Sequence, residues 1–227
     1  AEDAHGRNTA IGYNALKIQD AGADGYNTAV GYQAGLAIDT GVRNSILGYA
    51  ARTLTTGSEN VAIGYLTMNA GTTGGKNVAI GTQALTANLL GSRNVAVGQE
   101  ALKAFVAGGG DNTYNTAVGF GSGLAVTDGT NNTLIGGLAG DALTTGDNNI
   151  IIGYNAAASA VGVDNTTVIG TGTTTNAIVH GLRKLVNATA TNVAAPRINN
   201  IYNFSDADGA TVTLPDSGDG SMIGASF

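Results

Sequence analysis

Two pairs of aspartates near the C-terminal end of the chain have the spacing that comes closest to a hydrolytic site: Asp206 with Asp208, and Asp216 with Asp219. Paired carboxylates can cleave glycosidic bonds, one acting as a general acid and the other as a base or nucleophile. Both pairs stand in the stretches SDADG and PDSGDG, where Asp is common because its side chain hydrogen-bonds the backbone of a turn. We therefore interpret them as turn residues.

Other side chains suited to catalysis or metal binding are few. His5 and His180 have no neighbouring Ser or Cys that would form a nucleophile with them. The chain contains no Cys, which excludes disulfides and thiolate metal sites. The stretch DADG at 206–209 is similar to the start of a calcium loop, but the later ligands of that loop are missing. The sequence thus predicts no enzyme, no metal and no cofactor.

Tyrosines at regular intervals offer a different chemistry, the binding of sugar rings. Tyr13, Tyr32, Tyr49 and Tyr65 recur at one place in a repeated motif, and Tyr presents both an apolar face and a hydroxyl to a ligand. The alternative, which we favour, is an aromatic ladder that stacks from repeat to repeat and shields the edges of the turns.

A long insertion, KAFVAGGGDNTYN at 103–115, is the second candidate for receptor binding. Loops on a repetitive scaffold often carry function, and Phe105, Asp111 and Tyr114 would be the contact residues. The simpler interpretation is a loop that is tolerated because it points outward, since lengthening a surface loop costs little free energy.

The composition restricts the partners. The net charge of −6 argues against nucleic acid, whose binding requires clustered Lys and Arg. No apolar run approaches the ~20 residues that span a bilayer. The sequence begins without Met and ends in an apolar run, so we expect both ends to have been cut from a longer protein.

These candidate residues are positioned by a repeat of about 17 residues. The motif NTAIGYNA at 8–15 returns as NTAVGYQA at 27–34, NVAIGTQA at 77–84 and NTAVGFGS at 115–122. We number each unit from its Asn as position 0; a Gly follows at position +4 in nine units and one place late, at Gly170, in the tenth. The ten Asn are Asn8, Asn27, Asn44, Asn60, Asn77, Asn94, Asn115, Asn132, Asn149 and Asn165.

Each unit predicts a short strand that ends at its Gly. Position +3 is always aliphatic and position +2 is mostly Ala, so both faces of the strand are apolar, as in parallel strands buried on both sides. A looser apolar segment, at 15–18, 84–87, 101–104 and 124–127, predicts a second strand in each coil. The expected fold is an all-β parallel β-roll, or β-solenoid, of about ten coils. We expect the Asn to stack into a structural ladder rather than to bind a ligand.

The alanines suggest an assembly. We expect the large aliphatics at position +3 to fill the thin core, which leaves the Ala face in need of a cover. Three copies that pack their Ala faces around an axis would provide it, while a single-chain triangular solenoid is the alternative. The axis residues of this homotrimer would be Ala10, Ala29, Ala62, Ala79, Ala96 and Ala117. Bulky residues replace Ala in the units with Leu134 and Ile151, where we expect a wider rod.

The unit N-T/V-A-I/V-G-Y-x-A resembles the head repeats of trimeric autotransporter adhesins and, more closely, repeats of bacteriophage tail fibres. The resemblance extends from Asn8 to about Gly170. It implies an intertwined homotrimer of parallel β-rolls, other tail or surface-fibre proteins as partners, and attachment to a glycan or protein on a host cell. The implied location is a virion tail, with the bacterial outer surface as the alternative.

We expect three segments: a repetitive shaft at 1–170, a transition at 171–196, and the start of a C-terminal β-domain at 197–227. The predicted function is a structural and adhesive component of a phage tail fibre or spike. A bacterial adhesin head is one rival prediction, and a passive spacer that binds nothing is another.

Overall fold

The computed structural model forms two units, residues 1–178 and 179–227. It describes residues 6–20, 24–107, 112–171, 203–205 and 211–213. Several predictions fall outside these ranges: the catalytic alternative for Asp206, Asp208, Asp216 and Asp219, the two histidines, the binding role of Asp111, and the transition at 172–196.

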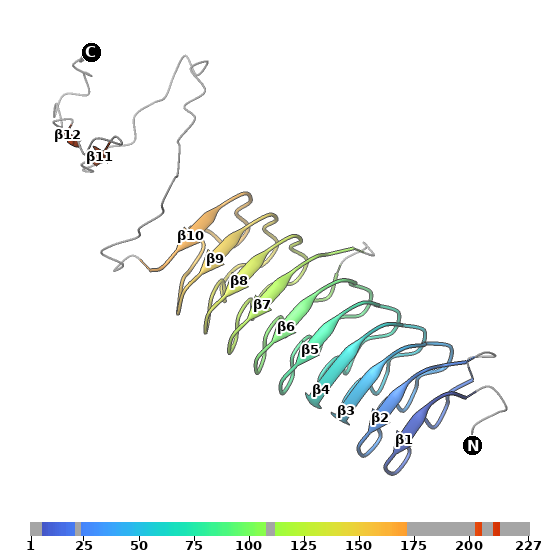
Figure 1. Ribbon diagram of the computed structural model, residues 1–227. Helices are drawn as coiled ribbons and strands as arrows, with labels where there is room; N and C mark the ends of the chain where they lie inside the picture. Colours follow the sequence, from blue (N-terminus) through green and yellow to red (C-terminus); the bar gives the residue numbers. More distant parts are fainter. Residues whose placement is uncertain (1–5, 21–23, 108–111, 172–202, 206–210, 214–227) are drawn as a thin grey trace. The chain divides into compact units, whose positions relative to one another are not determined.

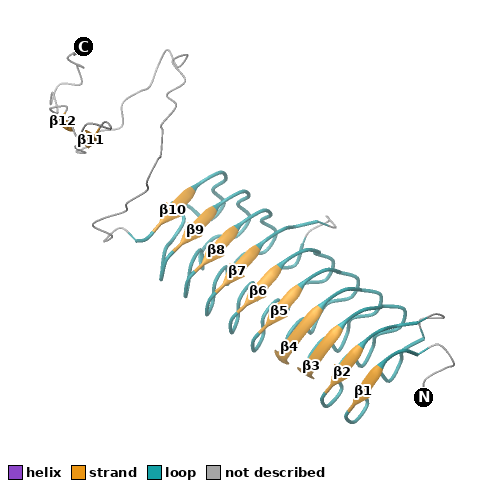
Figure 2. Cartoon of the chain, in the orientation of Figure 1, coloured by secondary structure: helices purple, strands orange, loops and turns teal. Residues whose placement is uncertain are grey.

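Among the described residues of the first unit, ten short parallel strands stack in chain order into one sheet, one strand for each repeat (Figures 1 and 2). The register joins equivalent repeat positions, such as Ala79 with Ala96. The predicted all-β solenoid is therefore confirmed. The strands are β1 (Thr9–Ile11), β2 (Thr28–Val30), β3 (Ser45–Tyr49), β4 (Val61–Tyr65), β5 (Val78–Ile80), β6 (Val95–Val97), β7 (Thr116–Val118), β8 (Thr133–Ile135), β9 (Ile150–Ile152) and β10 (Thr167–Ile169).

The predicted second strand of each coil is wrong. None of these segments is a strand: those at 15–18, 84–87 and 101–104 form hydrogen-bonded turns, and the one at 124–127 does so at 124–125. Leu85 and Leu102 within them adopt left-handed backbone, with φ of 51° and 48°. Their amides still bond to the next coil, as Leu85 N–H does to the carbonyl of Ala101 at 2.9 Å. A coil this short must reverse direction sharply, and left-handed residues achieve this where a second extended strand would not.

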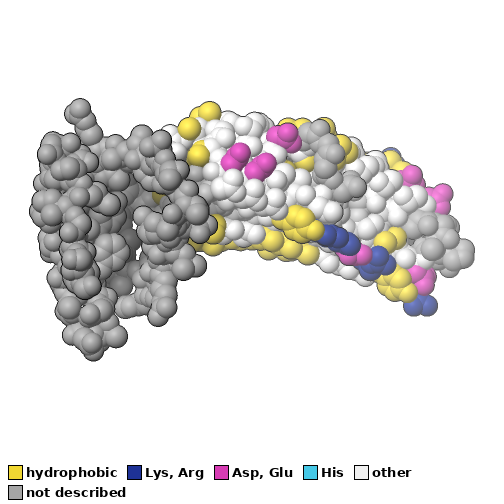
Figure 3. All heavy atoms as spheres, turned by 90° about the horizontal axis from the view of Figure 1, so that it is seen from above, with side chains coloured by type: hydrophobic (Ala, Val, Ile, Leu, Met, Phe, Trp, Pro, Cys, Tyr) yellow, Lys and Arg dark blue, Asp and Glu magenta, His cyan; other side chains and the backbone are white. Residues whose placement is uncertain are grey.

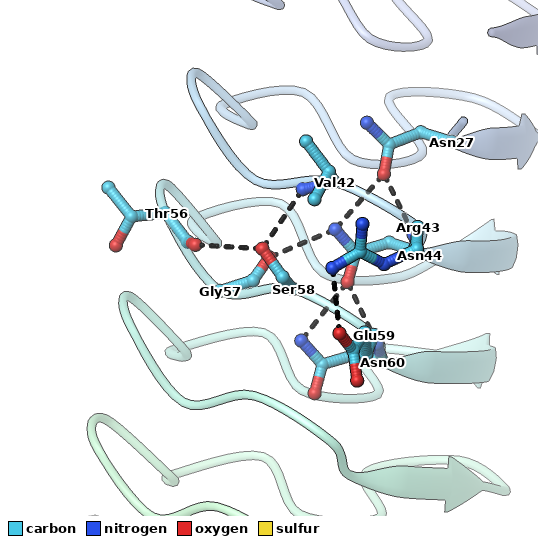
Figure 4. A network of polar contacts seen from close by, with 9 residues as sticks. All are labelled: Asn27, Val42, Arg43, Asn44, Thr56, Gly57, Ser58, Glu59 and Asn60. Carbon is cyan, nitrogen blue, oxygen red and sulfur yellow. Dashed lines mark hydrogen bonds and ion pairs between the residues drawn. The ribbon is translucent and has the colours of Figure 1, made fainter. Parts of the chain in front are cut away.

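The Asn ladder is confirmed. Asn27 Oδ1 accepts a hydrogen bond from the backbone N–H of Asn44 at 2.8 Å, and Asn44 Oδ1 accepts one from that of Asn60 at 2.9 Å (Figure 4). The amide nitrogen of most of these Asn donates to a Gly carbonyl, as Asn44 Nδ2 does to Gly57 at 2.9 Å, and that of Asn149 donates to the carbonyl of Val163 at 2.7 Å. These side chains are buried, so the ladder satisfies backbone groups that water does not reach.

The ladder ends at Asn149, and the assignment of Asn165 to it is wrong. Thr167 pairs with Ile150, so Gly170 is level with Gly153 and no Gly is displaced. The backbone N–H of Thr166 donates to Asn149 Oδ1 at 2.9 Å and thus holds position 0 of the tenth unit. Asn165 itself is exposed, one place earlier.

The predicted orientation of the strands is also wrong. The five alanines of the inner strands, assigned above to a trimer axis, are fully buried inside the coil of a single chain, and Ala10 in the first coil is exposed. The part of each coil that lies across the core from the strand, which we call the opposite wall, explains this burial. Its side chains Ile38, Leu54, Leu85 and Phe105 point into the interior, and only a methyl-sized side chain fits across from them. The buried alanines are Ala29, Ala62, Ala79, Ala96 and Ala117.

Where a strand carries a large inward residue instead of Ala, the opposite wall carries Gly. A Cβ added to Gly123 would lie 2.7 Å from Leu134 Cδ1, and one added to Gly140 would lie 2.9 Å from Leu134 Cδ2. Ile46 and Gly35 form the same combination, at 3.0 Å. The added volume that predicted a wider rod is therefore taken up inside the coil.

The second unit is described only for β11 (Asn203–Ser205) and β12 (Thr211–Thr213), which pair antiparallel. The C-terminal β-domain at 197–227 stays a prediction. In the part of the chain that the structure describes, no helix is long and apolar enough to cross a membrane.

Candidate binding surface on the outward face of the sheet

The outward face of the sheet carries an unbroken row of aliphatic side chains at position +3, which we call the aliphatic column. Its members are exposed or half-buried, and Ile11, Leu47 and Ile169 are each 49% exposed or more. A continuous apolar surface along a whole stack exceeds what soluble monomers usually leave uncovered. The column consists of Ile11, Val30, Leu47, Ile63, Ile80, Val97, Val118, Ile135, Ile152 and Ile169.

The ends of the strands carry a second row, the end column at position +5. Four of its tyrosines stack, with ring centroids 5.5–5.9 Å apart and interplanar angles of 12–20°, so the predicted aromatic ladder is confirmed. Each inner ring stacks on its two neighbours, and the guanidinium of Arg52 also lies over Tyr49, 4.5 Å from the ring centroid. The hydroxyls are left for other contacts. The end column consists of Tyr13, Tyr32, Tyr49, Tyr65, Thr82, Gln99, Phe120, Gly137, Tyr154 and Thr171.

The starts of the strands carry a third row, the start column at position −1. From Tyr26 onward its residues adopt left-handed backbone, with φ between 49° and 65°. This conformation costs roughly 1–2 kcal/mol for most residues, and Asn and Gly tolerate it best. Asn fills the last three units only. The column consists of Arg7, Tyr26, Arg43, Glu59, Lys76, Arg93, Tyr114, Asn131, Asn148 and Asn165.

Neighbours within the start column interact. Arg43 Nη2 lies 2.8 Å from Glu59 Oε1, and this hydrogen bond, together with the charges of Lys76 and Arg43, lowers the pKa of Glu59. Arg93 Nη1 donates to the Tyr114 hydroxyl at 2.5 Å, and its guanidinium lies 5.5 Å from the ring centroid. Figure 3 shows charged side chains beside apolar side chains along one margin of the first unit.

The predicted receptor-binding residues of the insertion have different positions. Phe105 is fully buried in the core, so its assignment to a binding loop is wrong. The next residue, Val106, bonds as an ordinary coil residue would, because its N–H donates to the carbonyl of Thr127. Tyr114 is 47% exposed, but it belongs to the start column rather than to a loop. The glycan-binding role of Tyr13, Tyr32, Tyr49 and Tyr65 remains a prediction.

Sequence reasoning missed the start column altogether. The signal was present, because a charged or aromatic residue precedes the repeat Asn in each of the first seven units. Within 6–20, 24–107 and 112–171, no three acidic, His or Cys side chains gather closely enough to hold a metal ion.

The outward face thus has an apolar centre and two different margins, and it is the candidate binding surface of the described residues. Its geometry suits a long and regular partner better than a small molecule. Comparison with known protein families, curated proteins and solved structures finds nothing that matches this chain.

Proposed function

We propose that the chain is a structural and adhesive component of a bacteriophage tail fibre or spike, in which three copies form a shaft that mediates attachment to a host cell. One observation carries the proposal: the unbroken aliphatic column on the outward face of the stack. Such a face requires a cover with the same length and the same repeat. Another copy of the chain has both.

The size of the face supports a stable assembly. Ten rungs at about 4.8 Å, and a width of six residues from margin to margin at no more than about 3.3 Å each, cover at most roughly 900 Å² per copy. Stable interfaces bury about 800 Å² on each partner. The middle of the face is the most apolar part, because Val61, Val78 and Val95 stand beside the aliphatic column there.

Three copies related by a rotation axis parallel to the stack would turn their aliphatic columns toward one another. This cyclic arrangement closes and leaves no outward face uncovered. It replaces the arrangement first expected, in which the alanines formed the axis, because those alanines are inside the coil.

A projecting role agrees with the interior. The Asn ladder bonds coil to coil through dry, satisfied hydrogen bonds, which favours a stiff rod over a flexible tether. The resemblance of the repeat to tail-fibre repeats supports a virion tail, with other tail proteins as partners and a host-surface glycan or protein as receptor.

The assembly is tested by the mass of the purified chain in light scattering. We expect three times the 22.4 kDa of one chain. Ile80→Asp would bury a carboxylate at the axis, and we expect it to yield single chains that still show a β-sheet circular dichroism spectrum. Glu100→Gln, an acid-to-amide change at a turn residue outside these columns, is the control and should leave the mass unchanged. A stable single chain without any substitution would contradict the proposal.

Attachment is tested by competition. We expect the purified trimer to reduce the adsorption of virions that carry this chain, and the Ile80→Asp chain to do so much less. If the trimer forms but does not compete at any concentration, the shaft is a passive spacer and its adhesive role is wrong.

A further inference from the structure

The two margins of the outward face match one another in chemistry in several rungs. Within one chain they are separated by the strand itself, which has three residues, or five in β3 and β4, and spans roughly 10 Å or more at about 3.3 Å per residue. In Figure 4, Arg43 and Glu59 lie at the starts of their strands, beside the ladder residues Asn44 and Asn60. A match between margins that cannot touch within a chain points to contact between chains.

Aromatic residues stand at both margins of the same rung. In the second rung, Tyr26 in the start column is level with Tyr32 in the end column, and in the seventh, Tyr114 is level with Phe120. All four rings are about half exposed. Tyr26 and Tyr114 also bear the cost of left-handed backbone, with φ of 52° and 49°. Asn or Gly would avoid that cost, so the rings themselves have a use. Part of it lies within the chain, because the guanidiniums of Arg7 and Arg93 lie 5.6 Å and 5.5 Å from the ring centroids of Tyr26 and Tyr114, and the exposed part of each ring is available to a neighbouring copy.

Charged residues follow the same rule. Arg43 is level with Tyr49 and Glu59 with Tyr65, so that a charged group faces a row of phenol hydroxyls. In the next two rungs the end column has no ring, and Lys76 and Arg93 are level with Thr82 and Gln99.

The eighth rung completes the pattern. Its end column holds Gly137, which offers no side chain, and its start column holds Asn131. Asn is the non-glycine residue that left-handed backbone accommodates most readily. In the first eight rungs the start column thus carries a long side chain where the end column has a side chain to meet, and Asn where it has none. The ninth rung departs from this pattern, because Asn148 is level with Tyr154.

We propose that the start column of one copy contacts the end column of the next copy, at the same rung, throughout the assembly. The proposal rests on the trimeric shaft proposed above. A rotation about an axis parallel to the stack keeps the rungs level and brings the strand starts of one copy to the strand ends of its neighbour. The Arg43 guanidinium, bonded to Glu59 through Nη2, keeps further donors for the neighbour's Tyr49 hydroxyl.

This pairing also determines the register of the copies. A slip of one rung would bring Tyr114 opposite Gln99 or Gly137 and lose its ring contact. A slip of one copy in one direction would likewise bring Glu59 opposite Thr82. The margins therefore select a level arrangement, whereas the aliphatic column alone would permit sliding.

The test uses engineered disulfides, because the natural chain has no Cys. In the variant Lys76→Cys/Thr82→Cys the two thiols belong to one rung, so they can meet only between copies. A disulfide requires Cα atoms less than about 7 Å apart. On mild oxidation we expect covalent trimers on a denaturing gel without reductant, since each chain bonds to both neighbours, and single chains once reductant is added.

The matched control is Lys76→Cys/Tyr154→Cys, whose thiols stand four rungs apart, about 19 Å along the stack. We expect single chains from it under the same oxidation. Both variants must retain the mass and the spectrum of the parent before they are oxidised.

The outcomes separate the two proposals. If the variant is a trimer by mass but its same-rung thiols do not join, the margin contact is wrong while the trimeric shaft survives. If the control pair joins as readily as the same-rung pair, the level register is wrong. If the unoxidised chain is single, both proposals fail together.

Discussion

The interior and the outer surface of the stack each carry a side-chain ladder, and the two ladders differ in regularity. The Asn ladder inside the coil continues from Asn8 to Asn149 without a substitution. The Tyr ladder outside holds from Tyr13 to Tyr65 and then gives way to Thr82. Both stack at the same spacing and both are built by the same repeat.

The difference reflects what each environment tolerates. Each buried amide or carbonyl group that a substitution leaves unpaired costs about 1–3 kcal/mol, so the ladder position in the interior retains Asn. An exposed column has water as an alternative partner and can vary. Variation on the outside can therefore follow the needs of a partner, and this is why the margins carry information that the interior does not.

The largest expected effect comes from breaking the inner ladder. Asn60→Ala would leave the backbone N–H of Asn77 and the carbonyl of Gly74 without their partners. Two buried unpaired groups should lower the free energy of unfolding by about 2–6 kcal/mol. Chemical denaturation measures the change.

The control for that substitution is Asn165→Gly, which changes an Asn that is exposed and outside the ladder. Gly accepts the same left-handed backbone, so we expect less than about 0.5 kcal/mol. An equal loss at both positions would contradict the corrected register.

Exchanging the large and the small side chain that face each other across the core should change the free energy of unfolding nearly as much. Leu134→Ala removes a fully buried side chain and should cost about 2–5 kcal/mol. Gly123→Leu alone should overpack the same space. The double variant recreates the combination of Leu85 with Ala96 found elsewhere in the stack, and we expect a favourable coupling of about 1–3 kcal/mol in a double-mutant cycle. Simple additivity of the two losses would show that the side chains do not share one space.

That exchange also shows what the sequence could have revealed. The period, the strand, the Asn ladder and the Tyr ladder follow from residue types at fixed intervals. Alternation alone says that a strand has two faces and not which one is inside, and here both faces are apolar. The informative signal was the size exchange: large residues replace Ala at 46 and 134 where Gly stands at 35 and 123.

Phe105 illustrates a second limit. Its place in a long insertion suggested a loop, whereas its position in the repeat matches buried Ile38, Val126 and Leu143. Aligning the whole unit, including its irregular half, would have assigned Phe105 to the core. The contacts of the start column could not have been found in this way, because they depend on left-handed backbone that the residue types Tyr, Arg and Glu do not suggest.

A smaller effect is expected from the outer ladder. Tyr32→Ala removes stacked contacts with Tyr13 and Tyr49, at 5.6 Å and 5.9 Å. Aromatic pairs contribute about 0.5–1.5 kcal/mol each, and exposure favours the lower end. Phe120→Ala is the control, because both rings belong to the end column and would lose the same kind of contact with a neighbouring copy. The difference between the two thermal midpoints therefore isolates the stack. Equal midpoints would show that the ladder contributes nothing to stability.

The smallest expected effect concerns Glu59, the acidic member of the start column. Its pKa is lowered from 4.5, mainly by the hydrogen bond from Arg43, so the folded state favours the carboxylate. The resulting stability is present above pH 4.5 and is lost as the pH falls through the lowered value. The thermal midpoint of the natural chain should therefore exceed that of Glu59→Gln at neutral pH, with the gap closing on acidification. Because the pair is exposed, 1 M salt should also close the gap. A gap that persists in acid or in salt would mean that Gln disturbs packing rather than charge, and that Arg43 is held in place by something other than Glu59.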